Sequence, residues 1–342
     1  MARLARPLGL VVAATIALAL ASATTARGAG LDLVPPSLLS PSAYLSARAA
    51  GYWGGDYTVA SGEKVTVFAS EAYEEKPEEN QRWADFLASL VHGKELSMLT
   101  LYRLSPGEIR SRCGFGALAC YSPRQHSIVA PVEQPAPDVS VEAALIHEYG
   151  HHVAQERSNA PWHAIDRGTK RWASHENICA RARRGEVFPS AQIGDRYELN
   201  PGEGFAEAYR VLNERRLGRR ETSWEAVSRT FYPDEAALRL LDQDVVHPWA
   251  GGTTFVYSGR LRRNADRTYS VSTPLDGKLT IALSAPARFS LEALGRARRL
   301  ARAFARAGGA RGSTTICGTR SLRVRVAAHA AAGAYSLRVT TP

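Results

Sequence analysis

The sequence predicts an α+β domain over residues 63–250, followed by a small all-β sandwich domain over residues 251–342. In the first range, segments in which every second residue is apolar, as in a strand, alternate with segments in which apolar residues recur every three or four positions, as in a helix. In the second, short runs alternate apolar and polar residues between Gly, Pro, Asp and Asn. The charge changes at the same boundary. The second range has 16 Lys and Arg against 3 Asp and Glu, net +13, whereas the rest has 27 against 30, net −3.

The first 23 residues have the layout of a secretory signal peptide. Arg3 and Arg6 precede an apolar run from Leu8 to Leu20, and Ala21-Ser22-Ala23 offers small residues for cleavage. The run is too short and too rich in alanine for a membrane span. We therefore predict a secreted protein, extracellular or associated with the cell wall. The next segment, 24–62, could be a propeptide.

Strand and helix patterns alternate in the first half of the α+β domain. The expected elements are a strand over Val65–Ala69, a helix over Pro77–Val91, a strand over Leu96–Tyr102, a loop with two cysteines, a strand over His126–Pro131 and a helix over Val141–Gln155. Trp83, Phe86, Leu87 and Leu90 recur at helical spacing, which predicts one buried face of the first helix.

Four cysteines in an exported chain predict two disulfides. Cys113 and Cys120 bracket a short loop and form the expected local bridge, which leaves Cys179 and Cys317 for a long-range bridge. A zinc site of cysteine and histidine is the alternative, but the CxxC spacing that structural zinc prefers is absent.

The most informative motif is His147-Glu148-Tyr149-Gly150-His151, an HExxH pattern inside an apolar helix. Imidazoles at i and i+4 lie on one helix face, where both can bind one zinc ion at about 2.0–2.1 Å. Glu148 then lies near the metal and can take a proton from a water. The alternative is a solvated helix with surface histidines, but the neighbours are too apolar for that. We therefore predict a Zn²⁺ site with Glu148 as general base.

A catalytic zinc site needs a third protein ligand. The metzincin pattern places a further His six residues after the second one, and Arg157 at that position excludes it. The remaining candidates among the histidines have no supporting pattern: His152, His163, His175 and His247.

The segment Asn200–Tyr209 (NPGEGFAEAY) is the better source of that ligand. Glu203 and Glu207 share a helix face, where two carboxylates repel each other unless a cation lies nearby. The alternative is a capping box in which Glu203 only closes the turn begun by Asn200. Two glycines in this first turn disfavour a helix and indicate the close approach of another backbone.

HEYGH with NPGEGFAEAY downstream of it resembles the gluzincin group of zinc metallopeptidases, in particular its lethal factor-like branch. The resemblance implies a zincin-like catalytic domain in which His147, His151 and Glu203 bind the metal. It also implies that Glu207 orients a ligating histidine. Tyr197 is the nearest match to a tyrosine that stabilises the oxyanion, although its offset differs.

In zincins, the strand before the HExxH helix forms the edge of the substrate cleft. The resemblance therefore implies that Ser127–Ala130 is this edge, to which an extended peptide can add by main-chain hydrogen bonds. Between the two motifs lies a long segment that is rich in Trp and Arg. Its aromatic residues predict an ordered structure in which Trp162 and Trp172 are packing residues.

In its pattern of short alternating runs separated by turn residues, the C-terminal range resembles the pre-peptidase C-terminal module of secreted bacterial proteases. The stretch Leu291–Ala307 could instead form a basic amphipathic helix, because Leu, Ala and Arg favour helix. The excess of arginine indicates an anionic partner: a cell-wall polymer, a lipid surface or an acidic glycan. The alternative is that arginine only keeps the module soluble. No nucleic-acid motif is present.

These observations together predict a secreted zinc metalloendopeptidase. Two other functions stay open. One is a secreted protein that binds a polyanion or the cell wall and uses an inactive zincin scaffold. The other is a zinc hydrolase that acts on a non-peptide amide, since the motif does not specify the acyl group.

Overall fold

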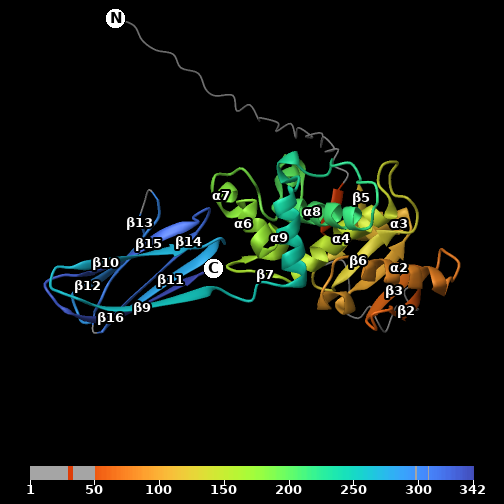
Figure 1. The fold of residues 1–342 in the computed structure, drawn as a ribbon. Coiled ribbons are helices and arrows are strands. Elements are labelled where there is room, and N and C mark those ends of the chain that lie inside the picture. Colours follow the sequence, from red (N-terminus) through yellow and green to blue (C-terminus); the bar gives the residue numbers. More distant parts are fainter. Residues whose placement is uncertain (1–29, 34–50, 297–298, 307) are drawn as a thin grey trace, which may run out of the picture.

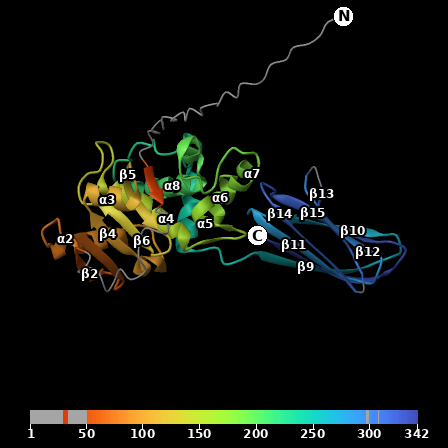
Figure 2. The same ribbon diagram turned by 180° about the vertical axis from the view of Figure 1, so that it is seen from behind.

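The computed structural model describes residues 30–33, 51–296, 299–306 and 308–342. The predicted signal peptide lies outside these residues. Two domains are arranged in succession along the chain, a mixed α and β domain and an all-β domain, and they lie side by side in both views (Figure 1 and Figure 2). Among the described residues, no helix combines the length and the apolar character that crossing a membrane would require.

A six-stranded mixed sheet runs through the first domain, in the order β1-β5-β6-β4-β3-β2. The strands are β1 (Gly30–Leu33), β2 (Tyr52–Thr58), β3 (Lys64–Ser70), β4 (Thr100–Leu104), β5 (Ala117–Ser122) and β6 (Ser127–Pro131). β3, β4 and β6 are parallel, β2 and β5 pair antiparallel with β3 and β6, and β1 adds in parallel to β5. Thus β2, which lies before residue 63, is part of the same sheet.

Helices cover both faces of this sheet and fill the space beside it. They are α2 (Pro77–Ser89), η2 (Lys94–Met98), α3 (Pro106–Cys113), α4 (Val141–Gln155), α5 (Ala164–Arg167), α6 (Lys170–His175), α7 (Ile178–Arg183), η3 (Gly194–Leu199), α8 (Pro201–Arg216), η4 (Arg229–Phe231) and α9 (Glu235–Val246). A short hairpin of β7 (Ser158–Asn159) and β8 (Trp162–His163) comes after α4.

The largest core lies between the sheet and the two helices α2 and α4. Val67 and Leu101 of the sheet contribute to it together with Leu87 of α2 and Ile146 of α4, all of which are buried. A second, smaller core on the opposite face includes Ile109 of α3. The period of 2 in the strands and of 3.6 in the helices explains why the sequence pattern identifies these elements.

α4 crosses α8 at very short range, and Gly150 makes this possible. A β-carbon at Gly150 would lie 2.9 Å from the α-carbon of Ala206 on α8. Both helices begin at defined caps, since the side chain of Ser140 accepts from the Ala143 amide and that of Asn200 accepts from the Gly202 amide. The crossing brings the HExxH motif against the first turns of α8.

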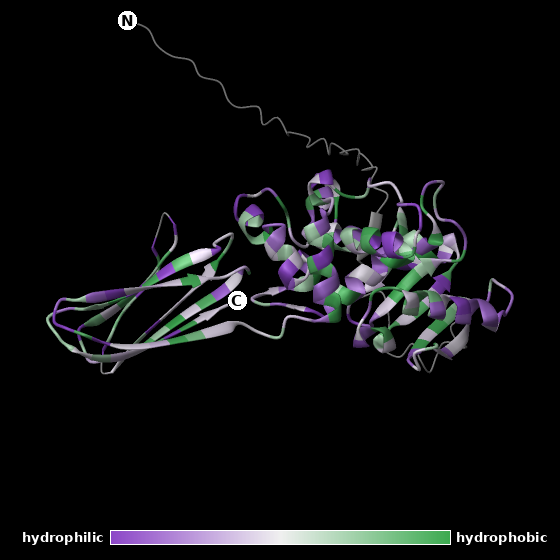
Figure 3. Cartoon of the chain, in the orientation of Figure 1, coloured by the Kyte–Doolittle hydropathy of each residue, from purple (hydrophilic) through white to green (hydrophobic). Residues whose placement is uncertain are grey.

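The second domain consists of two antiparallel four-stranded sheets with one core between them, which confirms the all-β prediction. The sheets have the orders β10-β15-β12-β13 and β14-β11-β16-β9. The strands are β9 (Thr253–Leu261), β10 (Asp266–Ser272), β11 (Gly277–Ser284), β12 (Phe289–Leu294), β13 (Arg299–Phe304), β14 (Gly309–Ile316), β15 (Ser321–Ala328) and β16 (Gly333–Thr341). Hydrophilic and hydrophobic residues alternate along these strands (Figure 3).

Three expectations from the sequence are wrong. The strand expected over Leu96–Tyr102 begins only at Thr100, because Lys94–Met98 form a 3-10 helix. The alternative helix over Leu291–Ala307 is replaced by parts of β12 and β13, whose backbones pair with each other. β6 is not the edge of the sheet. The residues interpreted as a cysteine loop contain a strand, β5, that pairs with β6 and separates it from the edge.

A dense polar junction connects the two domains, and its centre is Asp276, which is 2 % exposed. The Asp276 amide donates to Ser174 Oγ of α6, and its carboxylate accepts from the Gly318 amide and from Arg320. The disulfide Cys179–Cys317 joins α7 to the loop after β14 beside these contacts. The β domain is thus fixed to the helices that surround the HExxH region.

Candidate metal centre

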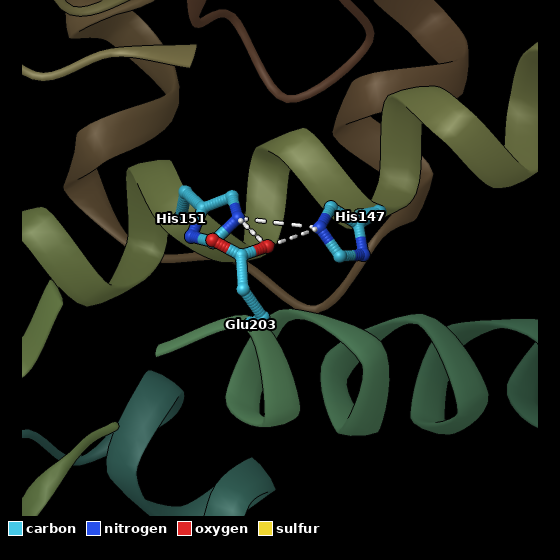
Figure 4. A group of neighbouring side chains, drawn as sticks. All are labelled: His147, His151 and Glu203. Atoms are coloured by element: carbon cyan, nitrogen blue, oxygen red, sulfur yellow. Dashed lines mark hydrogen bonds and ion pairs between the residues drawn. The ribbon is translucent and has the colours of Figure 1, made fainter. Parts of the chain in front are cut away.

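Two helices supply the side chains of a buried cluster. His147 and His151 come from α4 and Glu203 comes from the first turn of α8, and all three side chains point toward one another (Figure 4). Each of these residues is 0 % exposed. They form the group of His, Cys, Asp and Glu residues in the described part of the chain whose geometry could hold a metal ion.

The three facing atoms form a nearly equilateral triangle. His147 Nε2 and His151 Nε2 are 3.2 Å apart, and each lies 3.2 Å from Glu203 Oε2. Two ligands at about 2.0–2.1 Å from a tetrahedral zinc ion are about 3.3 Å apart, by simple trigonometry. The spacing of the donors therefore fits a small tetrahedral cation.

The hydrogen bonds behind the triangle fix which atoms face it. His147 Nδ1 lies 2.7 Å from Glu207 Oε1, and a carboxylate can only accept, so Nδ1 carries a proton and Nε2 is the ring nitrogen that faces the triangle. A carboxylate oxygen and two imidazole nitrogens then meet in a buried site. Glu203 Oε1 is buried there without a hydrogen-bond partner among the described residues. With neutral imidazoles, such a set of ligand atoms is stable around a cation.

Charge interactions around the cluster shift the pKa values of its carboxyl groups. Burial alone would raise the pKa of Glu203, but the positive charges and hydrogen bonds of protonated His151 and His147 outweigh it and hold the pKa at about 2. The pKa of Glu207 is also about 2, because the charge of Arg210 and the hydrogen bond with His147 exceed the effect of burial. Both side chains are therefore anionic at neutral pH, as metal binding and histidine orientation require.

The capping alternative for Glu203 does not describe its position. The N-cap bond of α8 joins the Asn200 side chain to the Gly202 amide, whereas the Glu203 carboxylate points to the histidines. The close approach of another backbone that the glycines indicated is present at Gly202, whereas at Gly204 the near neighbour is a side chain. A β-carbon at Gly202 would lie 2.4 Å from the carbonyl oxygen of Ile165, and one at Gly204 would lie 2.6 Å from the ring of Phe231.

Glu148 and Tyr197, which were expected to serve as general base and to stabilise the oxyanion, both interact with residues of this cluster. Glu148 is 0 % exposed on α4, and its charge acts on His147. The hydroxyl of Tyr197, a residue of η3, donates to Glu203 Oε2 at 3.1 Å. A carboxyl group and a phenol therefore border the three donor atoms.

The other histidines considered from the sequence lie apart from this group. His152 is buried against Tyr121 and the Glu95 carbonyl, and His175 pairs with Asp234. His163 and His247 are not members of the cluster that could hold a metal. Trp172, predicted to be a packing residue, is fully buried with its ring 5.3 Å from that of Phe205.

Arg210 is a residue behind the cluster that the sequence patterns did not single out. Its guanidinium donates to both oxygens of Glu207, at 3.1 and 2.6 Å, and to Glu214 at 2.6 Å. Glu214 in turn accepts from the amide and hydroxyl of Thr222. The alternation of Glu207, Arg210 and Glu214 at i, i+3 and i+7 was the available signal, because charges at that spacing share one helix face.

Both predicted disulfides are present. Cys113–Cys120 closes the turn between α3 and β5, and Cys179–Cys317 spans 138 residues between the domains. They are consistent with an extracellular protein.

No protein-family model matches the chain, and a sequence comparison finds no match among curated proteins.

Proposed function

We propose that this protein is a secreted zinc metallopeptidase of gluzincin type that hydrolyses peptide bonds. The observation that carries the proposal is the buried triangle of His147 Nε2, His151 Nε2 and Glu203 Oε2, with sides of 3.2 Å. Two imidazoles and one carboxylate are a ligand set found in zinc peptidases. The two disulfides support an exported enzyme.

The residues around the triangle have separate tasks in this mechanism. When bound, zinc supplies Lewis-acid polarisation of a carbonyl and lowers the pKa of a water to about 7. The Glu148 carboxylate takes the proton of the attacking water and returns it to the nitrogen of the leaving amine. Tyr197 donates its hydroxyl hydrogen to the carbonyl oxygen as negative charge develops there.

Glu207 and Arg210 hold His147 in the tautomer that the mechanism requires. The bond from His147 Nδ1 to Glu207 keeps one proton on Nδ1, so that Nε2 is the nitrogen that would bind the metal, and Arg210 keeps Glu207 ionised. This arrangement fixes the ring before the metal arrives, so little reorganisation is needed on binding.

Three substitutions of Glu by Gln test the proposal. Glu148→Gln should keep zinc and lower turnover by about 10²–10⁴-fold, because it removes a base and no ligand. Glu203→Gln should lose zinc and turnover together, since a neutral amide replaces an anionic ligand. Glu142→Gln, in the first turn of the same α4 helix, where the side chain is 30 % exposed and pairs with Arg219, is the matched control and should change neither. Zinc is measured by mass spectrometry of the purified protein and turnover on a peptide library.

Different failures have different meanings. Full zinc content and normal turnover in Glu203→Gln would contradict the third ligand. Normal turnover in Glu148→Gln would contradict the mechanism. If the unmodified protein holds stoichiometric zinc but cleaves no peptide, the substrate would instead be a non-peptide amide.

A further inference from the structure

On one outer face of the β domain, side chains of the same chemical type lie in rows across the strands. In the sheet β14-β11-β16-β9, Leu279, Ile281 and Leu283 of β11 point into the core. The alternate residues of each strand therefore point outward. The strand register stacks these outward residues into rows that cross the sheet (the strands are labelled in Figure 1).

The central row is cationic and the rows beside it carry hydroxyl groups. Ala282 of β11 pairs with Arg311 on one side and with Arg338 on the other. The row on one flank contains Ser284, Ser336 and Ser258, and the row on the other flank contains Ser313, Thr280, Thr340 and Thr254. Since adjacent strands are about 4.8 Å apart, the α-carbons of the two arginines lie about 10 Å from each other across a small residue.

The surface is hollowed at this point. A hollow of about 560 Å³ lies over the strands and has small residues in its lining, among them Ala282, Ser284 and Ser336. Arg306, Arg311 and Arg338 line the same hollow. Three guanidinium groups therefore border one space that has room for a ligand.

No carboxylate of the domain neutralises these three arginines. The domain has three acidic residues, and each is already engaged: Asp266 with Arg325, Asp276 with Arg320, and Glu292 with Arg299 and Arg302. Within the described ranges, neither Arg306, Arg311 nor Arg338 takes part in an ion pair. Like charges held together repel, so an anion in the hollow would lower the electrostatic energy.

The chemistry of the face selects among anionic ligands. Guanidinium groups bind carboxylate, sulfate or phosphate with two parallel hydrogen bonds. The flanking serines and threonines can exchange hydrogen bonds with the hydroxyl groups of sugars. Val256 is the large hydrophobic residue exposed in these rows, and a single valine neither anchors a protein in a lipid interface nor stacks on bases.

We propose that this face binds an acidic polysaccharide, with its anionic groups held by Arg306, Arg311 and Arg338. The proposal is independent of the peptidase assignment. A polymer with repeated anionic groups can contact the two arginines of the central row simultaneously, while its neutral hydroxyl groups contact the flanking rows. The domain would thereby hold the protein on a charged glycan matrix.

Binding by the full-length protein tests this proposal, with alginate as the acidic polysaccharide and dextran as the neutral one. Replacing Arg306, Arg311 and Arg338 with Gln should weaken binding to alginate about tenfold or more, because charged hydrogen bonds are lost. The matched control replaces Arg262, Arg263 and Arg323 with Gln. It removes the same charge from exposed positions outside the hollow and should weaken binding only slightly.

A second variant tests the hollow without removing any arginine. Ala282→Glu places a carboxylate between Arg311 and Arg338, where it should pair with them and abolish binding to alginate. Thermal unfolding of each variant checks that the domain is folded. Binding of dextran should be undetectable.

Several results would overturn the proposal. Equal losses in the two triple variants would assign binding to overall charge. Unchanged binding in Ala282→Glu would exclude the hollow. Stronger binding to phosphatidylglycerol vesicles or to single-stranded DNA than to alginate would identify a lipid-binding or nucleic-acid-binding surface. Failure to bind alginate, heparin and polygalacturonate would mean that the arginines only keep the domain soluble.

Discussion

Arg210 holds both carboxylate oxygens of Glu207, and Glu207 in turn holds the His147 ring. The arginine is 2 % exposed, so its charge is compensated almost entirely by Glu207 and Glu214. Removal of one member of such a buried set leaves a charge without a partner, which costs about 3–5 kcal/mol. The proposed metal site therefore depends on a residue that touches none of its ligands.

We predict that Arg210→Met lowers zinc affinity by about 10–100-fold, the range expected when the support of a ligating histidine is lost. Competition with a chelator measures the affinity, and urea unfolding of the metal-free protein measures the stability. The double variant Glu207→Gln/Arg210→Met leaves one buried anion, Glu214, where Arg210→Met leaves two, and should recover part of the stability but little of the affinity. Unchanged zinc affinity in Arg210→Met would show that the arginine acts on folding alone.

At the scale of elements, the end of α6 contains a carboxyl group in an unfavourable position. Burial raises the pKa of Glu176 from 4.5 to about 7, and His175 and Arg181 compensate only in part. Between these two pH values the unfolded chain has released the proton while the folded protein still binds it. The unfolded state then binds fewer protons, so stability falls as the pH rises from 4.5 to 7.

Glu176→Gln should remove this pH dependence. At about pH 5 the variant and the unmodified protein should have similar free energies of unfolding. At about pH 8 the variant should be the more stable, by at most about 3 kcal/mol, given about 1.4 kcal/mol for each unit of pKa shift. Urea unfolding at the two pH values measures the difference, with the exposed Glu75→Gln as control. An equal effect of Glu176→Gln at both pH values would refute the prediction.

The edge of the large sheet shows how one short element can change a functional inference. β5 contains Cys120 and pairs with β6, so the residues Ser127–Ala130 are inside the sheet. Apolar and small residues fill Ala117–Ser122, and a sequence of that kind beside a disulfide has no distinct strand period. A peptide that adds to this sheet would meet β1 or β2 at its edges, not β6.

At the scale of the whole molecule, the disulfide Cys179–Cys317 and the contacts of Asp276 connect two domains whose backbones are otherwise joined by residues 247–252. These linking residues lie outside any helix or strand. Polar interfaces between domains open readily unless a covalent bond holds them. The disulfide closes a segment of 138 residues, for which chain entropy alone amounts to about 4–5 kcal/mol.

We predict that the double variant Cys179→Ser/Cys317→Ser is cleaved several-fold faster than the unmodified protein by an added protease within residues 247–252, because the domains separate more often. Cys113→Ser/Cys120→Ser is the control, since its bridge closes a turn within the first domain. Mass spectrometry locates the cut. Equal cleavage rates in the two double variants would mean that the polar contacts alone hold the domains together.

Local periodicity accounts for the features that the amino-acid sequence was sufficient to predict. His147 and His151 share a face because residues four apart on a helix must do so, and the alternation after Gly251 defined an all-β domain. The same rule predicted that Glu203 and Glu207, which are also four residues apart, share a helix face. Four cysteines in a chain with export features predicted two disulfides, and both are present.

Which of these local patterns meet in space depends on the packing of segments that are distant in the sequence. The contact of Gly150 with Ala206 sets the distance between α4 and α8, and this distance brings Glu203 Oε2 to 3.2 Å from two imidazoles. Arg210, the position of β5 and the junction at Asp276 likewise depend on such packing. A one-dimensional pattern fixes the direction of a side chain on its own element, whereas the packing of elements fixes what that side chain touches.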